Sequence, residues 1–218
     1  MYIPPLFREA DRAVLHAMIR DARLSIMICN GADGLPEISY LPMLFDETDG
    51  ANGSLLGHLA RANPHWKSLA ETGKATVIFK GADAYVSPAW YPTKQVHHRH
   101  VPTWNYEAVH AICRVEVFDD AARLRDVVTR LTDRYEAGRA EPWTIDQAPA
   151  DYIAAMLKAI VGVKLTIVDL QGKRKLSQNR EPADRQGVRD ALAVSAEPGD
   201  QELLRSMHEL HEKEQSSR

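Results

Sequence analysis

Residues 109–117 read VHAICRVEV, and this stretch carries the clearest structural pattern in the chain. Apolar side chains recur at every second position from Val109 to Val117, and polar side chains fill the positions between them, except at Ile112. Successive side chains of a β-strand point to opposite faces, so this alternation is typical of a strand with one buried face. The sequence therefore predicts a strand near the middle of the chain.

Further strands are predicted before this stretch, where short apolar runs are separated by turn residues. These runs cover residues 24–29, 37–45, 54–59 and 75–79, with an extended continuation at 84–87. The pair Asp33-Gly34 separates the first two runs and is a strong hairpin signal. Apolar spacing predicts a helix at 11–22, and Asn63 as N-cap before Pro64 predicts a short helix at 64–70.

Helices dominate the second half of the sequence. Asp119 or Asp120 is expected to cap a helix that Gly138 ends, and Pro149 opens another. A final strand and two polar helices are predicted at 163–170, 181–194 and 200–214. Because the strands follow one another instead of alternating with helices, a doubly wound parallel sheet is not favoured. The pattern predicts a mainly β, α+β fold: a small β-barrel with packed helices and a helical C-terminal tail.

The composition narrows the class of protein. Among 218 residues there are 27 Lys+Arg and 30 Asp+Glu, which give a net charge of −3, and 44% of the residues are hydrophobic. These values are ordinary for a soluble globular protein and exclude a strongly basic domain that coats nucleic acid by charge alone. From the length we expect one domain at residues 1–195 and a polar helical tail at 196–218.

The N-terminus and the cysteines predict a cytoplasmic protein. Charges at Arg8, Glu9 and Asp11 precede any apolar stretch that could form a signal segment, and no run approaches the ~20 apolar residues of a membrane span. Cys29 and Cys113 are too few for a disulfide framework, and their spacing matches no metal motif. We interpret both cysteines as buried packing residues.

Three segments carry residues that packing leaves unexplained, and the first covers residues 57–66 (GHLARANPHW). It runs from a strand end into a helix N-terminus, where backbone N–H groups and the helix dipole favour an anion. Arg61 adds a planar guanidinium suited to a phosphate, and His58 and Asn63 add further donors. The segment indicates an anion site, and a surface arginine beside a capped helix is the alternative.

The second segment, residues 87–106, is rich in proline, histidine and aromatic residues. Its tryptophans and tyrosines are Trp90, Tyr91, Trp104 and Tyr106. Aromatic side chains in a proline-rich loop can form a flat apolar wall for a planar ligand, or they can fold over the end of the barrel. The three histidines within 97–100 have no acidic or cysteine partner at ligand spacing, so no metal site is predicted.

The third segment, residues 172–180 (GKRKLSQNR), places four positive charges and three small polar side chains close together. Such a cluster fits a phosphate, the polar rim of a ligand site or a nucleic-acid backbone, and a solvated basic turn is the alternative. The sequence shows no helix-turn-helix pair with a basic recognition helix, so direct contact with DNA is not favoured.

These segments, in this order, resemble the PaiB-type FMN-binding transcriptional regulators. The resemblance rests on HLARANP (58–64), SPAWYP (87–92), VPTWNY (101–106) and KLSQNR (175–180), and it extends to the opening MYIP and to IVG (160–162). It implies an FMN-binding split β-barrel, usually a homodimer with the flavin at the subunit interface. It also implies a negative regulator of genes for degradative enzymes and sporulation.

The resemblance and the side-chain chemistry together suggest which residues contact FMN. The candidates for the phosphate are His58, Arg61 and Asn63. The candidates for lining the site, in one arrangement from the other subunit, are Lys175, Ser177, Gln178 and Asn179. The candidates for flanking the isoalloxazine are Trp90, Tyr91, Trp104 and Tyr106. FMN needs an apolar wall and a cluster of donors a short distance apart, and neighbouring segments supply both.

Two classes of function remain open at this point. The first is a flavin-dependent regulator that acts as a homodimer. The alternative is an FMN-dependent oxidoreductase acting on a small molecule, because the flavin itself supplies the redox chemistry. No acid–base pair or nucleophile in the sequence identifies a catalytic residue. Haem binding is a third and less favoured interpretation, with His58, His65 and the 97–100 loop as ligands.

Overall fold

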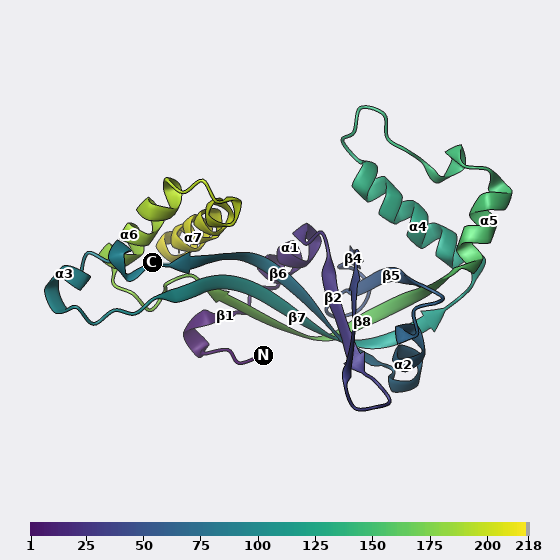
Figure 1. The fold of residues 1–218 in the computed structure, drawn as a ribbon, viewed down its shortest axis with the longest axis horizontal. Helices are drawn as coiled ribbons and strands as arrows, with labels where there is room; N and C mark the ends of the chain where they lie inside the picture. Colours follow the sequence, from purple (N-terminus) through teal and green to yellow (C-terminus); the bar gives the residue numbers. More distant parts are fainter. Residues whose placement is uncertain (217–218) are drawn as a thin grey trace. The chain divides into compact units, whose positions relative to one another are not determined.

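The computed structural model describes residues 1–216, which form two compact units. The tail unit comprises residues 1–12 and 80–109 and the described chain from Gln171 onward. The barrel unit comprises Ala13–Phe79 and His110–Leu170. Three strands, β6 (Lys74–Val86), β7 (Thr103–Phe118) and β8 (Ile160–Lys175), supply residues to both units (Figure 1).

The strand predicted at 109–117 is confirmed as the larger part of β7, and its N-terminal half alternates buried and less buried side chains. The runs at 75–79 and 84–87 belong to one continuous strand, β6. β8 has 16 residues and extends beyond the predicted 163–170 to Lys175. Its last residues are charged yet buried, so hydropathy alone does not reveal that the strand continues.

The strands of the barrel unit follow the order β3-β2-β6-β7-β8-β5-β4. β2 (Ser25–Asn30) and β3 (Pro36–Leu41) form the predicted antiparallel hairpin, whose turn contains Gly34 at φ +81°. β5 (Ser54–Ala60) pairs antiparallel with both β4 (Leu44–Asp46) and β8. The strand predicted at 37–45 is divided into β3 and β4 at Pro42, since proline has no N–H to give to a sheet.

Helices complete the barrel unit: α1 (Arg12–Asp21), α2 (His65–Thr72), α4 (Ala121–Glu136) and α5 (Ala150–Lys158), with a 3-10 turn η3 (Ile145–Gln147). The predicted cap of α4 is confirmed, because the Asp120 carboxylate accepts a 2.8 Å hydrogen bond from the N–H of Arg123. α4 and α5 pack over β4 and the ends of β7 and β8 around a buried apolar cluster. This cluster consists of Leu44, Phe118, Leu124, Val127, Leu131, Ile145, Ile153 and Leu157.

The tail unit contains η1 (Pro5–Phe7), β1 (Arg8–Glu9), η2 (Pro88–Trp90), α3 (Lys94–His97), α6 (Pro182–Ala193) and α7 (Pro198–Ser216). β1 pairs antiparallel with the end of β8. The core beneath α6 and α7 consists of Ala84, Val86, Tyr91, Leu176, Val188, Leu192, Leu203 and Met207. α6 approaches η2 so closely that a Cβ at Gly187 would overlap the carbonyl oxygen of Trp90, so only glycine fits there.

The predicted α+β class, with strands in sequence and helices at the C-terminal end, is confirmed. The expected domain boundary after residue 195 falls inside the tail unit, between α6 and α7, which pack against each other. The division into a domain at 1–195 and a polar helical tail at 196–218 stays a prediction. Among residues 1–216 there is no helix of the length and apolar character that crossing a bilayer requires.

Candidate functional site

The predicted ligand residues fall into two groups, one in each unit, and the barrel unit holds His58, Arg61 and Asn63. His58 lies on β5, directly opposite Gly162 of β8. Its Nδ1 atom is buried and has no hydrogen-bond partner within residues 1–216. Burial lowers the pKa of His58, so the imidazole is neutral at physiological pH and offers a donor or an acceptor to a ligand.

Arg61 lies just beyond β5 and is anchored by main-chain oxygens. Its Nε donates to the carbonyl of Lys158 (2.8 Å) and its Nη2 to the carbonyl of Ile160 (3.1 Å). These bonds fix the guanidinium plane at the C-terminal end of α5. A guanidinium has five N–H donors, so donors remain for a phosphate, and the Asp119 carboxylate lies 3.9 Å from Nη1.

Asn63 was predicted as the N-cap, but Pro64 occupies that position without a side-chain cap, and Asn63 lies one residue before it. The helix begins at His65 instead of Pro64, and the Asn63 side chain accepts a 3.1 Å hydrogen bond from the N–H of His65. The amide nitrogen of Asn63 donates to the hydroxyl of Ser39 (3.1 Å). Asn63 therefore connects the HLARANP segment to the β2–β3 hairpin, and its amide is already engaged.

A cavity of about 460 Å³ lies beside Arg61, between α4 and α5. Its lining consists of Arg61, Asp119, Ala121, Leu124, Ala154, Leu157 and Lys158. The volume falls within the range of roughly 300–1,000 Å³ that is usual for ligand pockets. The lining carries two cationic side chains, Arg61 and Lys158, and one carboxylate, Asp119, on an otherwise apolar surface.

The tail unit holds Lys175, Ser177, Gln178 and Asn179 at the turn that follows β8. Lys175 Nζ donates to the carbonyl of Trp104 (2.5 Å) and to the hydroxyl of Thr103. Burial, aided by the nearby charges of Lys173 and Arg180, lowers the pKa of Lys175. The positive charges of Lys173, Lys175 and Arg180 would therefore favour an anion at this turn.

The turn itself is held by its own polar side chains. Gln178 Oε1 accepts a 2.6 Å hydrogen bond from the N–H of Leu176, and Gln178 Nε2 donates a 2.6 Å hydrogen bond to the carbonyl of Arg174. The side-chain amide therefore closes the turn. Ser177 has a positive φ of 65°, a backbone conformation that costs a non-glycine residue energy and concentrates at functional sites. Asn179 is exposed and open to solvent.

Asn105 is a candidate that the sequence interpretation did not select. It is fully buried, and its amide nitrogen donates to the Ser177 hydroxyl at 2.9 Å. Its Oδ1 has no hydrogen-bond partner in the part of the chain that the structure describes. The signal was available, because alternation along β7 places Asn105 on the face opposite its aromatic neighbours Trp104 and Tyr106.

The four predicted aromatic side chains do not share one environment. Trp104 is 54% exposed and makes an edge contact with Tyr85, while Tyr106 shares its face of β7 and lies 4.8 Å from Lys173 Nζ. Trp90 is half-buried, and Tyr91 packs inside the core of the tail unit, with the Arg180 guanidinium 4.8 Å from its ring centroid. The open aromatic surface is therefore the Trp104 side of β7.

The basic segment 172–180 is largely engaged within the tail unit. The Arg174 side chain is buried and its Nε donates to Glu107 at 2.5 Å, with Glu9 and Glu209 nearby. Lys173 is also buried and donates to the carbonyl of Tyr2 at 3.3 Å. These internal contacts leave less positive charge at the surface than the sequence alone indicates.

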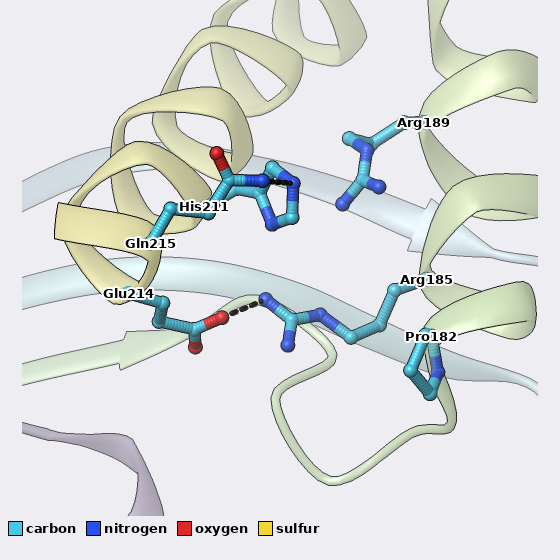
Figure 2. Close-up of a pocket in the computed structure, with 6 residues that line it drawn as sticks. All are labelled: Pro182, Arg185, Arg189, His211, Glu214 and Gln215. Atoms are coloured by element: carbon cyan, nitrogen blue, oxygen red, sulfur yellow. Dashed lines mark hydrogen bonds and ion pairs between the residues drawn. The ribbon is translucent and has the colours of Figure 1, made fainter. Parts of the chain in front are cut away.

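A second, smaller cavity of about 180 Å³ lies between α6 and α7. Figure 2 shows Arg185 and Arg189 reaching from α6 toward His211 and Glu214 of α7, with an Arg185–Glu214 ion pair of 2.8 Å. The cavity is below the usual size of ligand pockets, and one of its two arginines is neutralised by Glu214. It is too small to hold a flavin.

The residues present suit a flavin nucleotide. Orphaned buried polar atoms occur in both predicted groups or beside them, at His58 Nδ1 and Asn105 Oδ1. Buried polar atoms in proteins are nearly always satisfied, so a bound ligand, an ion or an ordered water is expected to complete each of them. Remaining donors on Arg61 and the cationic surroundings of Lys175 suit a phosphate, and the Trp104 face suits a planar ring.

Solved structures share this fold. The FAD and haem binding protein from Mycobacterium smegmatis has a TM-score of 0.56 at 18% identity, over 82% of this chain and 78% of that one. The flavocytochrome Anf3 from Azotobacter vinelandii has a TM-score of 0.56 at 17% identity, over 77% of this chain and 69% of that one. These two likenesses support the predicted split-barrel fold.

The chain belongs to the family described as "Putative FMN-binding domain", whose model matches residues 1–169. FMN is therefore its cofactor, as predicted. The chain is 28% identical to the Bacillus subtilis protein "Protease synthase and sporulation protein PAI 2", over 98% of this chain and 100% of that protein. The resemblance to PaiB-type proteins is confirmed by this match.

Proposed function

We propose that the protein is a flavin-dependent regulator that acts as a homodimer. The observation that carries the proposal is the similarity to PAI 2, which extends over nearly the whole of both chains. The name of that relative refers to proteases and sporulation, and we take both to be regulated processes. Bound FMN would supply redox chemistry, and the chain's own residues would hold and orient it.

The polar residues of the barrel unit are proposed to hold the FMN phosphate, and those of the tail unit are proposed to line the site from the other subunit of the homodimer. Arg61 would bind the phosphate through the donors that the main-chain carbonyls leave available, and His58 and Asn63 would border it. Lys175, Ser177, Gln178 and Asn179 would form the polar rim. Trp104 and Tyr106 would face the ring, whereas Tyr91 packs in the core of the tail unit with Trp90 against it. What supports this assignment is the chemistry of the donor set and the orphaned atoms at His58 and Asn105.

Regulation is proposed to act without direct DNA binding. The net charge is −3, and two cations of the segment 172–180, Lys173 and Arg174, are buried against internal partners. Protein–DNA affinity at physiological salt depends on several exposed cations that neutralise phosphates. A mobility-shift assay with genomic fragments at moderate salt should show no specific band, and a specific band at nanomolar protein would overturn indirect regulation.

The regulatory role is tested in the source organism. The chromosomal copy is replaced by the Arg61→Ala variant and, as control, by Arg125→Ala, which removes an equally exposed arginine paired to Asp146 in the same unit. Transcript profiling should show the same changed genes for Arg61→Ala and for a deletion. If both the deletion and Arg61→Ala leave all transcripts unchanged, the protein is not a regulator.

The oxidoreductase alternative is tested on the purified protein. Rapid mixing with NADH or NADPH should leave the flavin oxidised over the time of a normal turnover, because a regulator needs no fast hydride donor. Reduction on the millisecond scale, followed by turnover with an added acceptor, would favour the enzyme. Sedimentation equilibrium should give a mass about twice the 24.4 kDa of the chain, whereas a monomer at micromolar concentration would contradict the homodimer.

A further inference from the structure

Three metal-ligating side chains meet in the barrel unit, outside the predicted flavin residues. Cys29 of β2 and Glu37 of β3 are direct cross-strand partners, so their side chains share one face of the hairpin. His65 is the first residue of α2, which packs on that face. Residues far apart in the sequence are thus placed together by the hairpin and the helix.

The three ligand atoms lie close enough to share one ion. The Cys29 thiol, a Glu37 carboxylate oxygen and a His65 ring nitrogen all lie within 4.8 Å of one another. Ligand atoms around a tetrahedral zinc ion are separated by roughly 3.3–3.8 Å, given Zn–ligand distances of about 2.0–2.3 Å. The arrangement therefore needs side-chain movements of about 1 Å to close on a metal.

Two of the ligand atoms are buried and unsatisfied. Glu37 Oε2 and His65 Nε2 have no hydrogen-bond partner anywhere in residues 1–216. His65 is 2% exposed and Cys29 is 5% exposed, so bulk water does not reach the cluster to act as a hydrogen-bond partner. A buried carboxylate oxygen and a buried imidazole nitrogen without partners are costly, and a cation between them removes both costs.

The other atoms of the same side chains are held by neighbours. His65 Nδ1 lies 2.7 Å from the Ser39 hydroxyl, which also accepts a hydrogen bond from Asn63. Glu37 Oε1 accepts a 2.8 Å hydrogen bond from Ser68 of α2. Partners of this kind orient metal ligands in proteins, because a bond to Nδ1–H leaves the Nε2 lone pair directed at the ion.

We propose that Cys29, Glu37 and His65 bind a zinc-class divalent ion through Sγ, Oε2 and Nε2. A thiolate with an imidazole and a carboxylate is a donor set that suits zinc and disfavours calcium and magnesium. Three protein ligands leave a fourth position for water or another small ligand. The site does not rest on the proposed regulatory function, although Asn63 links it to the HLARANP segment.

The first experiment uses the wild-type, flavin-loaded protein. After chelation and dialysis, zinc is added and its content is measured per chain, and cobalt(II) is added to a parallel sample for a flavin-subtracted spectrum. We expect one zinc ion per chain and a thiolate-to-cobalt charge-transfer band. X-ray absorption at the zinc edge should show one sulfur ligand at about 2.3 Å and the remainder nitrogen or oxygen. A protein that retains no zinc and gives no such band would overturn the proposal and leave a metal-free polar cluster.

The second experiment uses variants with a matched control. Cys29→Ser and His65→Gln should each weaken zinc binding by more than about 100-fold, which exceeds the usual effect of losing a supporting hydrogen bond. Cys113→Ser removes the other buried cysteine, on β7, and should bind zinc as the wild type does. Equal zinc affinity in Cys29→Ser and the wild type would refute the site. If a variant does not fold, the sulfur ligand seen by X-ray absorption in the wild type decides the question.

Discussion

The buried arginine of the tail unit gives a prediction that can be worked out in magnitude. The Arg174 side chain is 4% exposed, and its Nε contacts Glu107, whose side chain is 6% exposed. Ser206 donates a 2.6 Å hydrogen bond to the other oxygen of Glu107. Replacing Arg174 by Met keeps a similar volume. It leaves the Glu107 carboxylate buried, with the Ser206 hydroxyl as its remaining hydrogen-bond donor.

Breaking a buried ion pair by removing one partner costs about 3–5 kcal/mol, because the remaining charge is buried without compensation. Because Ser206 still donates a hydrogen bond to Glu107, Arg174→Met is placed near the lower end of this range, at about 3 kcal/mol. For a chain of this length, 1 kcal/mol corresponds to a change in Tm of roughly 2–4 °C. The Tm should therefore fall by roughly 6–12 °C.

The assay is differential scanning calorimetry with saturating FMN. Arg174→Met is compared with the double variant Arg174→Met/Glu107→Leu, in which no buried charge remains, and with Arg205→Met, which changes an exposed arginine of α7. The double variant should recover most of the lost Tm, and Arg205→Met should change it by less than about 2 °C. A single variant as stable as the wild type would refute the view that the buried Arg174–Glu107 pair stabilises the tail unit.

Three further predictions concern single side chains. Leu124→Ala should lower the free energy of unfolding by about 2–5 kcal/mol in urea titrations, because Leu124 is 1% exposed in the α4–α5 cluster. A loss below about 1 kcal/mol would contradict that packing. Burial holds the pKa of His58 below its ordinary 6.5, so its contribution to stability is complete above that pH and is lost as the pH falls below it. The free energy of unfolding of His58→Gln should therefore fall less than that of the wild type between about pH 7.5 and pH 5. An equal fall in the urea midpoints of the two proteins over this range would disprove this. Burial raises the pKa of Cys113 to about 12, so its thiol should resist a disulfide reagent at about pH 8 until denaturant is added, and rapid labelling of the native protein would contradict its burial.

The sequence predicts most of the barrel because its signals there are local. The alternation in β7, the Asp120 cap and the Asp33-Gly34 turn each depend on neighbouring residues, and each is confirmed. The C-terminal half of β8 was not predicted, because Lys173 and Arg174 are polar. Both side chains find their partners far away in the sequence: Arg174 contacts Glu107, and Lys173 donates to the carbonyl of Tyr2.

The candidate site could be predicted by residue type but not by role. Gln178 and Tyr91 belong to recognisable motifs, yet Gln178 closes a turn and Tyr91 packs in a core, and neither outcome follows from the motif. The cluster of Cys29, Glu37 and His65 has no characteristic spacing, because a hairpin register and a helix start bring it together. Tertiary contacts therefore decide which polar residues remain available to a ligand.

The central claim is that the HLARANP segment holds the FMN phosphate, and a fluorescence titration of flavin-free protein with FMN tests it most directly. Arg61→Ala removes a charge-assisted contact of about 1.5–3 kcal/mol, so its Kd should rise by about 10- to 150-fold. Arg125→Ala, with the same charge change at similar exposure, should bind FMN like the wild type. Equal FMN affinity in the Arg61→Ala variant and the wild type would contradict the claim.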